Sequence, residues 1–101
     1  NIYACESLYL AGIHPARPAR RISLSRYHHL AAAIKQTLLQ AIACGGTTLR
    51  DFHDSSGQPG YFQQQLNVYG HGGAACPQCG APIRQIRQAQ RTTFYCGRCQ
   101  T

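Results

Sequence analysis

The chain has 101 residues, enough for one domain or for two small units that share a core. Ten basic residues, nine of them arginine, stand against three acidic ones and give a net charge of +7. Arginine suits phosphate because its guanidinium group can donate two parallel hydrogen bonds. Three carboxylates leave little scope for carboxylate-pair catalysis or for a calcium or magnesium site. No run approaches the 18 apolar residues of a membrane span.

The sequence begins at Asn1 and contains no methionine. An intact translation product would carry one, so we expect this chain to be a piece of a longer protein.

The first expected element is a helix over residues 1–11, where apolar side chains recur at helical spacing: Ile2, Cys5, Leu8 and Tyr9. Gly12 is expected to end this helix. Pro15 and Pro18 exclude a helix from residues 13–18, because proline cannot continue the hydrogen-bond ladder.

A second helix is expected to begin after Ser23, a favourable N-cap, and to end at Gly45–Gly46. Its apolar residues fall on one face: Tyr27, Leu30, Ala31, Ile34, Leu38, Ala41 and Ile42. Four arginines crowd the connection and the start of this helix: Arg17, Arg20, Arg21 and Arg26. The spacing fits a loose helix–turn–helix unit and equally an ordinary helical hairpin with a solvated basic turn.

The stretch from 45 to 60 is rich in glycine and has no sustained hydrophobic period. A loop of this length in a compact domain is usually functional or disordered. Residues 61–69 restore apolar spacing and predict a short helix or strand, followed by a flexible lead over 70–75.

Four of the six cysteines form two pairs with the C-x2-C spacing, separated by sixteen residues: Cys76, Cys79, Cys96 and Cys99. Each pair can place two thiolates on one tetrahedral zinc ion, and four thiolates leave no position for water, so the site would be structural. Two disulfides in a secreted scaffold are the alternative. A basic chain without a recognisable secretory signal and with two further cysteines argues against them.

The sixteen residues between the pairs predict a β-hairpin whose tip lies near Gln88–Arg91. At about 3.3 Å per residue, Arg91 would lie roughly 15 Å from the metal. Four arginines line this ribbon: Arg84, Arg87, Arg91 and Arg98. A rigid hairpin with a basic tip is suited to reach a nucleic-acid backbone.

Four stretches, in order along nearly the whole chain, resemble one family: NIYACESLYLAGIHP at 1–15, GGTTLRDF at 45–52, GYFQQQLNVYG at 60–70 and CPQCG…QRTTFYCGRCQ at 76–100. They resemble the C-terminal domain of bacterial formamidopyrimidine-DNA glycosylase. The resemblance implies a mainly α fold with a small β zinc ribbon. A helix–two-turn–helix domain would occupy residues 1–70 with a lesion-recognition loop at 45–60, and the zinc finger residues 71–101.

The resemblance also assigns site residues. Asn1 and Arg91 would grip the phosphates around the flipped nucleotide, and Tyr3 would make a weaker contact with the DNA. Arg91 would also assist the final δ-elimination, which makes it the one catalytic candidate. The loop that covers the extruded purine corresponds to six residues: Thr47, Thr48, Leu49, Arg50, Asp51 and Phe52.

The implied function is base-excision repair by a glycosylase/AP lyase that removes 8-oxoguanine and formamidopyrimidines from double-stranded DNA and cleaves the strand by β,δ-elimination. The implied protein carries one structural zinc ion and is a monomer of the bacterial cytoplasm, associated with the nucleoid. The family's N-terminal proline nucleophile is not in this chain, nor are its neighbouring glutamate and a distant lysine. The chain alone is therefore predicted to be inactive.

Three alternatives remain open at this stage. An endonuclease VIII-type fragment would act on oxidised pyrimidines. A freestanding zinc-ribbon module would bind DNA or RNA without an enzyme parent. For a zinc-stapled protein-interaction domain, Arg91→Ala would leave the affinity for DNA unchanged.

Overall fold

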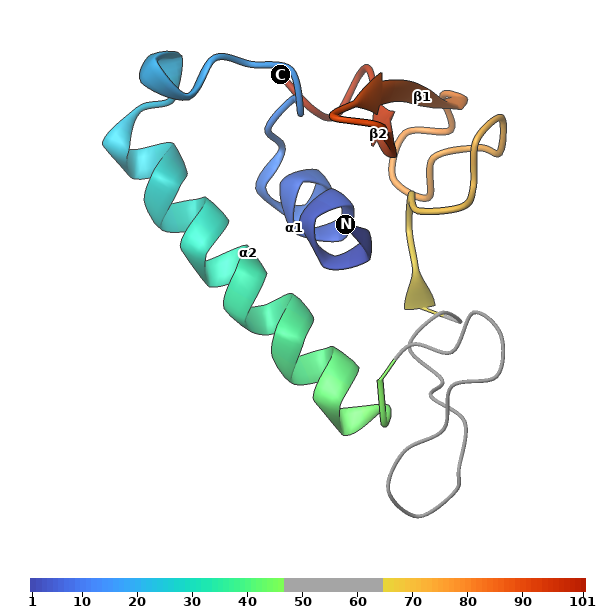
Figure 1. Ribbon diagram of the computed structural model, residues 1–101, viewed down its shortest axis with the longest axis horizontal. Coiled ribbons are helices and arrows are strands. Elements are labelled where there is room, and N and C mark those ends of the chain that lie inside the picture. Colours follow the sequence, from blue (N-terminus) through green and yellow to red (C-terminus); the bar gives the residue numbers. More distant parts are fainter. Residues whose placement is uncertain (47–64) are drawn as a thin grey trace.

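The computed structural model describes residues 1–46 and 65–101. Within these ranges the elements are, in chain order, helix α1 (Ile2–Ala11), a short 3-10 helix (Ala19–Arg21), helix α2 (Leu24–Ala43), and strands β1 (Ile83–Gln88) and β2 (Arg91–Cys96). In Figure 1, α1 lies between the long α2 helix on one side and the β-hairpin on the other. This arrangement confirms the predicted fold class, two helices followed by a small β ribbon. Neither helix in these ranges has the length and apolar character that a membrane crossing requires.

Helix α1 ends where the sequence predicted. Gly12 adopts the left-handed conformation, with φ at 72°, which costs glycine little because it has no Cβ. Its N–H donates to the carbonyl of Tyr9 at 3.1 Å, and the next N–H, of Ile13, donates to Leu8 at 3.0 Å. The last carbonyls of the helix are thus satisfied as the chain turns away.

Helix α2 begins as expected, because the Ser23 hydroxyl accepts the N–H of Arg26 at 3.2 Å. Its apolar face differs in part from the prediction. The residues buried on this helix are Ala33, Thr37 and Ala41. Ala41 was in the predicted series, whereas Ala33 and Thr37 each lie one position before a bulky predicted residue. Ile42, in that series, is 74% exposed. Small side chains permit a close approach of two helices, so the Ala/Thr line packs against α1 and the bulky residues lie on the adjacent side.

Helix α1 and the ribbon share one apolar core. Its buried members come from α1, from the segment after residue 65 and from the cysteine ribbon: Cys5, Tyr9, Val68, Cys76, Ile83 and Cys96. Gln100, which is 1% exposed, links the ribbon to the helical part by two hydrogen bonds. Its side-chain oxygen accepts the N–H of Cys96 at 2.8 Å, and its amide donates to the Ile13 carbonyl at 3.0 Å. The end of the ribbon is therefore bonded to the turn that follows α1.

A buried carboxylate fixes the segment that leads into the ribbon. Glu6 of α1 is 2% exposed and accepts the backbone N–H groups of Asn67, Val68 and Tyr69 at 2.7, 2.9 and 2.9 Å. The expected short helix or strand over 61–69 lies partly outside the described residues. Its described part forms bends, because these three N–H groups point to Glu6 and are not available to a helix or a strand ladder.

Candidate zinc centre and nucleic-acid interface

The four paired cysteines converge at one end of the ribbon. The sulfur atoms of Cys76, Cys79, Cys96 and Cys99 all lie within 4.8 Å of one another. The Sγ atoms of Cys76 and Cys99 are 3.8 Å apart, and those of Cys79 and Cys96 are 3.4 Å apart. A tetrahedral zinc ion with Zn–S bonds of about 2.3 Å needs sulfur–sulfur edges of about 3.8 Å. The four cysteines therefore fit one structural zinc ion, as the spacing predicted.

Tight turns carry the cysteine pairs. In the first turn, Gly80 donates its N–H to the Cys76 carbonyl at 2.9 Å with φ at 80°, a left-handed conformation that favours glycine. Backbone N–H groups also point at the sulfurs: Gln78 approaches Cys76 Sγ and Cys99 approaches Cys96 Sγ, each at 3.4 Å. These donors stabilise negative charge on the thiolates.

Their surroundings shift the pKa values of Cys76 and Cys99 in opposite directions. Burial raises the pKa of Cys76, but the hydrogen bond with Tyr9 and the N–H groups of Cys79 and Gln78 outweigh it and lower the pKa to about 6. Burial and hydrogen bonds with the neighbouring cysteines raise the pKa of Cys99 to about 12. Four anionic sulfurs at this spacing need a cation between them, and a bound metal displaces the remaining protons.

Tyr9 is a contact of the zinc centre that sequence reasoning placed only in the core of the first helix. It is 7% exposed, and its hydroxyl lies 3.2 Å from Cys76 Sγ. Burial and this hydrogen bond raise the pKa of Tyr9. The helical period showed that the ring faces inward, but only the fold brings residues 67 positions apart together.

The hairpin tip lies where the sequence placed it. The strands pair in antiparallel register from Ile83 with Cys96 to Gln88 with Arg91. Ala89 and Gln90 form the two-residue turn with φ at 50° and 66°, the geometry that matches the twist of a hairpin. Arg91 is exposed and is the first residue of β2 after this turn.

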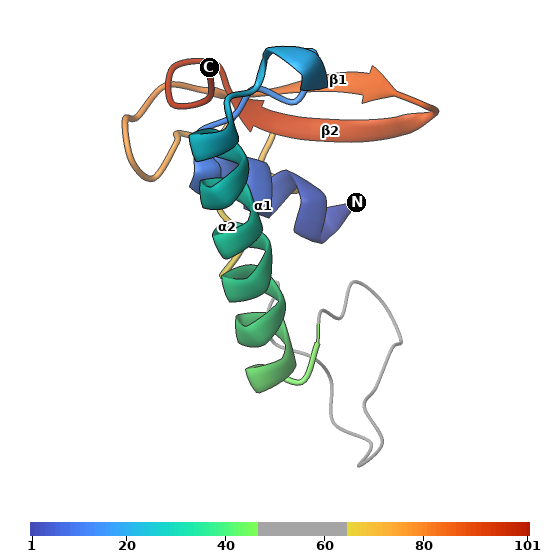
Figure 2. The same ribbon diagram turned by 90° about the vertical axis from the view of Figure 1, so that its left-hand side faces the viewer.

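Two side-chain hydrogen bonds tie the tip of the hairpin to the helical part. Asn1 precedes the first residue of α1, and its side chain makes no capping bond; it donates to the Thr92 carbonyl at 2.7 Å. On the other strand, the Gln88 amide donates to the Pro15 carbonyl at 3.2 Å. Figure 2 shows the N-terminal end of α1 on the side to which the tip points. Asn1 is thereby held beside the residue that follows Arg91.

The remaining predicted DNA contacts are Tyr3 and the lesion-recognition loop. Tyr3 is half-buried in the first turn of α1. The predicted lesion-recognition residues, Thr47 to Phe52, lie outside the described residues.

The charge of the described surface is almost wholly positive. In ranges 1–46 and 65–101, Glu6 is the only Asp or Glu, and it is buried. Not every arginine is equally available: Arg17 donates to the Thr101 carbonyl at 3.0 Å and Arg26 to the Gly12 carbonyl at 2.8 Å. These two bonds hold the basic connection and the start of α2 in place. A solvated basic turn was only one of the two alternatives that the sequence left open.

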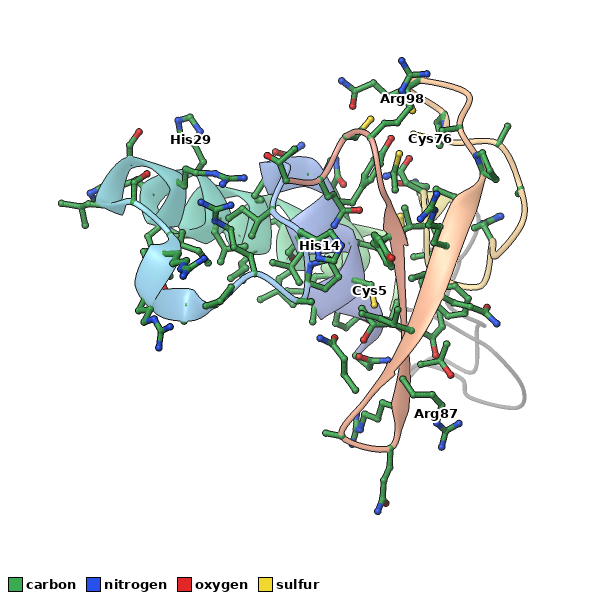
Figure 3. The ribbon with its side chains drawn as sticks, turned by 90° about the horizontal axis from the view of Figure 1, so that it is seen from above. Cys5, His14, His29, Cys76, Arg87 and Arg98 are labelled. Atoms are coloured by element: carbon green, nitrogen blue, oxygen red, sulfur yellow. The ribbon has the colours of Figure 1, made fainter. Side chains whose placement is uncertain are left out.

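Arginines also lie at both ends of the ribbon. In Figure 3, Arg87 lies toward the tip and Arg98 at the opposite end, near Cys76. The ribbon therefore offers two basic ends that can be tested separately.

Comparisons with known proteins agree along the whole chain. A family model described as the formamidopyrimidine-DNA glycosylase H2TH domain matches residues 1–53, and one described as a zinc finger found in FPG and IleRS matches residues 73–101. Formamidopyrimidine-DNA glycosylase of Alkalilimnicola ehrlichii is 64% identical over 99% of this chain. The protein of the same name from Marinobacter nauticus is 61% identical over 99% of the chain.

Solved structures give the same result. The crystal structure of the MutM (FPG) protein from Thermus thermophilus has a TM-score of 0.92 and 40% identity over 99% of this chain and 38% of its own. A variant of Lactococcus lactis FPG in complex with DNA that contains Fapy-dG has the same TM-score and identity over 100% of this chain and 37% of its own. The chain spans 36% and 37% of the length of the two curated relatives.

Proposed function

The chain belongs to the formamidopyrimidine-DNA glycosylase family, and we propose that it is the DNA-gripping part of a base-excision-repair glycosylase/AP lyase that removes oxidised purines. The observation that carries the proposal is the junction of Asn1 with the hairpin, 2.7 Å from its side-chain nitrogen to the Thr92 carbonyl. It sets the N-terminus of α1, the positive end of the helix dipole, beside the exposed Arg91. Both are anion-binding features.

The two groups have complementary roles toward DNA. Arg91 offers a guanidinium fork to a backbone phosphate, and the first turn of α1 offers backbone N–H groups and the positive end of its dipole. Tyr3 lies in the same turn and contributes a further contact. Such contacts orient the duplex without reading its sequence, as an enzyme that searches for damage requires.

We assign recognition of the extruded base to Thr47–Phe52 and, in the complete protein, assistance of δ-elimination to Arg91. The helical unit at 1–70 and the zinc finger at 71–101 act together in the cytoplasm, on double-stranded DNA at the nucleoid. This chain spans 36% of the length of a curated relative named formamidopyrimidine-DNA glycosylase. We infer that the chain alone binds DNA without excising a base.

The test compares two single arginine substitutions in the zinc-loaded chain. Fluorescence anisotropy measures binding to a labelled duplex that contains 8-oxoguanine, at about 50 mM and about 200 mM salt. Arg91→Ala removes the tip guanidinium, whereas Arg98→Ala removes the same charge from the zinc end of the ribbon. We expect Arg91→Ala to weaken binding about tenfold and to lower the salt slope by about one, with a much smaller effect of Arg98→Ala.

Two results would contradict this proposal. Equal losses for both variants would mean that only net charge matters, as in a non-specific basic module. Unchanged affinity in Arg91→Ala would favour a protein-interaction domain. Borohydride treatment of the chain on the same duplex checks the chemistry: we expect no covalent adduct.

A further inference from the structure

The zinc centre contacts α1 through a residue that is not one of its four cysteine ligands. The Tyr9 hydroxyl lies 3.2 Å from the sulfur of Cys76, and this contact is buried. Tyr9 is 7% exposed and Cys76 is 3% exposed. Water therefore has little access to either atom, and the hydrogen bond is not in competition with solvent.

The chemistry of the ligand sets the direction of this hydrogen bond. A cysteine that binds zinc does so as a thiolate, which has no proton to donate. The Tyr9 hydroxyl must then be the donor and the sulfur the acceptor. A donated hydrogen bond orients the sulfur lone pairs and stabilises its charge, as partners of metal ligands generally do.

The rest of α1 connects this contact to the hairpin. The helix carries Tyr9 near one end and Asn1 at the other, and Asn1 is bonded to Thr92 of β2. The ribbon is thus held to one short helix at two places, at the metal end and beside the tip.

We propose that Tyr9 is a positioning residue of the zinc site: by donating its hydroxyl hydrogen to the Cys76 thiolate it locks that ligand in place and slows the loss of zinc. The inference does not depend on DNA binding or on the proposed enzyme function. It rests on the described contact and on the four-cysteine cluster alone.

The test removes one oxygen atom. In the zinc-loaded chain, Tyr9→Phe keeps the ring and deletes the donor. Tyr69→Phe is the matched control, because Tyr69 packs against the same core and its ring contacts Phe94 at 5.1 Å between centroids. Zinc affinity is measured by competition with a chromogenic chelator, and the rate of zinc transfer to the chelator is measured in parallel.

We expect Tyr9→Phe to lower zinc affinity about 10- to 100-fold, the usual effect of removing a partner of a metal ligand, and to accelerate zinc loss. Tyr69→Phe should leave both quantities within about twofold of the original chain. Cobalt substitution supplies a readout that a purely structural role would not move. The sulfur-to-cobalt charge-transfer band should shift in Tyr9→Phe and stay unchanged in Tyr69→Phe.

An affinity within twofold of the original chain together with an unshifted cobalt band in Tyr9→Phe overturns the proposal. If that variant does not fold, nuclear magnetic resonance of the unsubstituted, cadmium-loaded chain decides. We expect a slowly exchanging Tyr9 hydroxyl proton coupled to cadmium through the sulfur. A Tyr9 hydroxyl proton that exchanges with water as fast as that of Tyr69 overturns the inference.

Discussion

We expect Glu6→Gln to lower the stability of the fold strongly, although the substitution changes only one side-chain atom. Its carboxylate accepts four hydrogen bonds: from the N–H groups of Asn67, Val68 and Tyr69 and from the Asn67 side-chain amide. Glu6→Gln preserves shape and volume but turns one oxygen into an NH2 group. Whichever way the amide is oriented, this donor then faces two other donors.

The expected cost follows from the two hydrogen bonds that the replaced oxygen accepted. A hydrogen bond to a charged group contributes about 1.5 kcal/mol at the lower end of its range, so two of them amount to about 3 kcal/mol. For a domain of this size, each kcal/mol corresponds to roughly 4–8 °C in Tm. We therefore expect Glu6→Gln to lower the Tm of the zinc-loaded chain by roughly 12–24 °C, measured by circular dichroism at fixed excess zinc.

The control is the reverse exchange at an exposed position of α2. Gln36→Glu should change the free energy of unfolding by less than about 0.5 kcal/mol. Glu6→Ala, which leaves all four donors without an acceptor and opens a cavity, should be worse than Glu6→Gln. A Tm of Glu6→Gln within about 3 °C of the original chain would refute the idea that this carboxylate joins the helix to the ribbon.

Three other changes test separate features. The Thr37 hydroxyl is buried without a hydrogen-bond partner among the described residues, so Thr37→Val should raise stability by about 1 kcal/mol in thermal unfolding while Thr37→Ser should not. Acid should release zinc, because protons compete with the metal for the thiolates and the pKa of Cys99 without metal is about 12. A chelator dye should detect more free zinc at about pH 5 than at about pH 8. Equal release at the two pH values would contradict this prediction. Leu38 and Ile42 are 42% and 74% exposed, so we expect copies of the chain to associate through this apolar face at high concentration. Replacing both residues by Gln should reduce this association in sedimentation velocity without lowering Tm. A strictly monomeric original chain would contradict the prediction.

Local signals in the sequence predicted the elements well, because each depends on neighbouring residues only. Ser23 can cap a helix wherever that helix lies, and Gly12 can end one because its conformational freedom is intrinsic. The two C-x2-C pairs are equally local: their spacing fixes a turn around a metal. The placement of Arg91 at the tip needed only the count of residues between the pairs.

What the sequence could not predict depends on contacts between distant segments. The apolar period of α2 placed bulky residues and Ala41 on the inner face, whereas the fold buries Ala41 together with Ala33 and Thr37. Choosing between adjacent faces requires knowing how closely α1 approaches. Likewise, nothing near Glu6 indicates that three backbone N–H groups some sixty positions away will need its charge.

The proposed grip on DNA also depends on these long-range contacts. Asn1 and Arg91 are ninety positions apart, and a flexible connection between them would have to be ordered each time DNA is bound, at a cost in affinity. The hydrogen bond from Asn1 to Thr92, the bond from Gln88 to Pro15 and the zinc-stapled core remove that freedom before DNA arrives. Because the one acid among the described residues is buried in this scaffold, the exposed surface keeps its positive charge for phosphate. The same residues that stabilise the fold thereby preorganise the proposed interface, so loss of zinc should weaken DNA binding even though no zinc ligand needs to touch DNA.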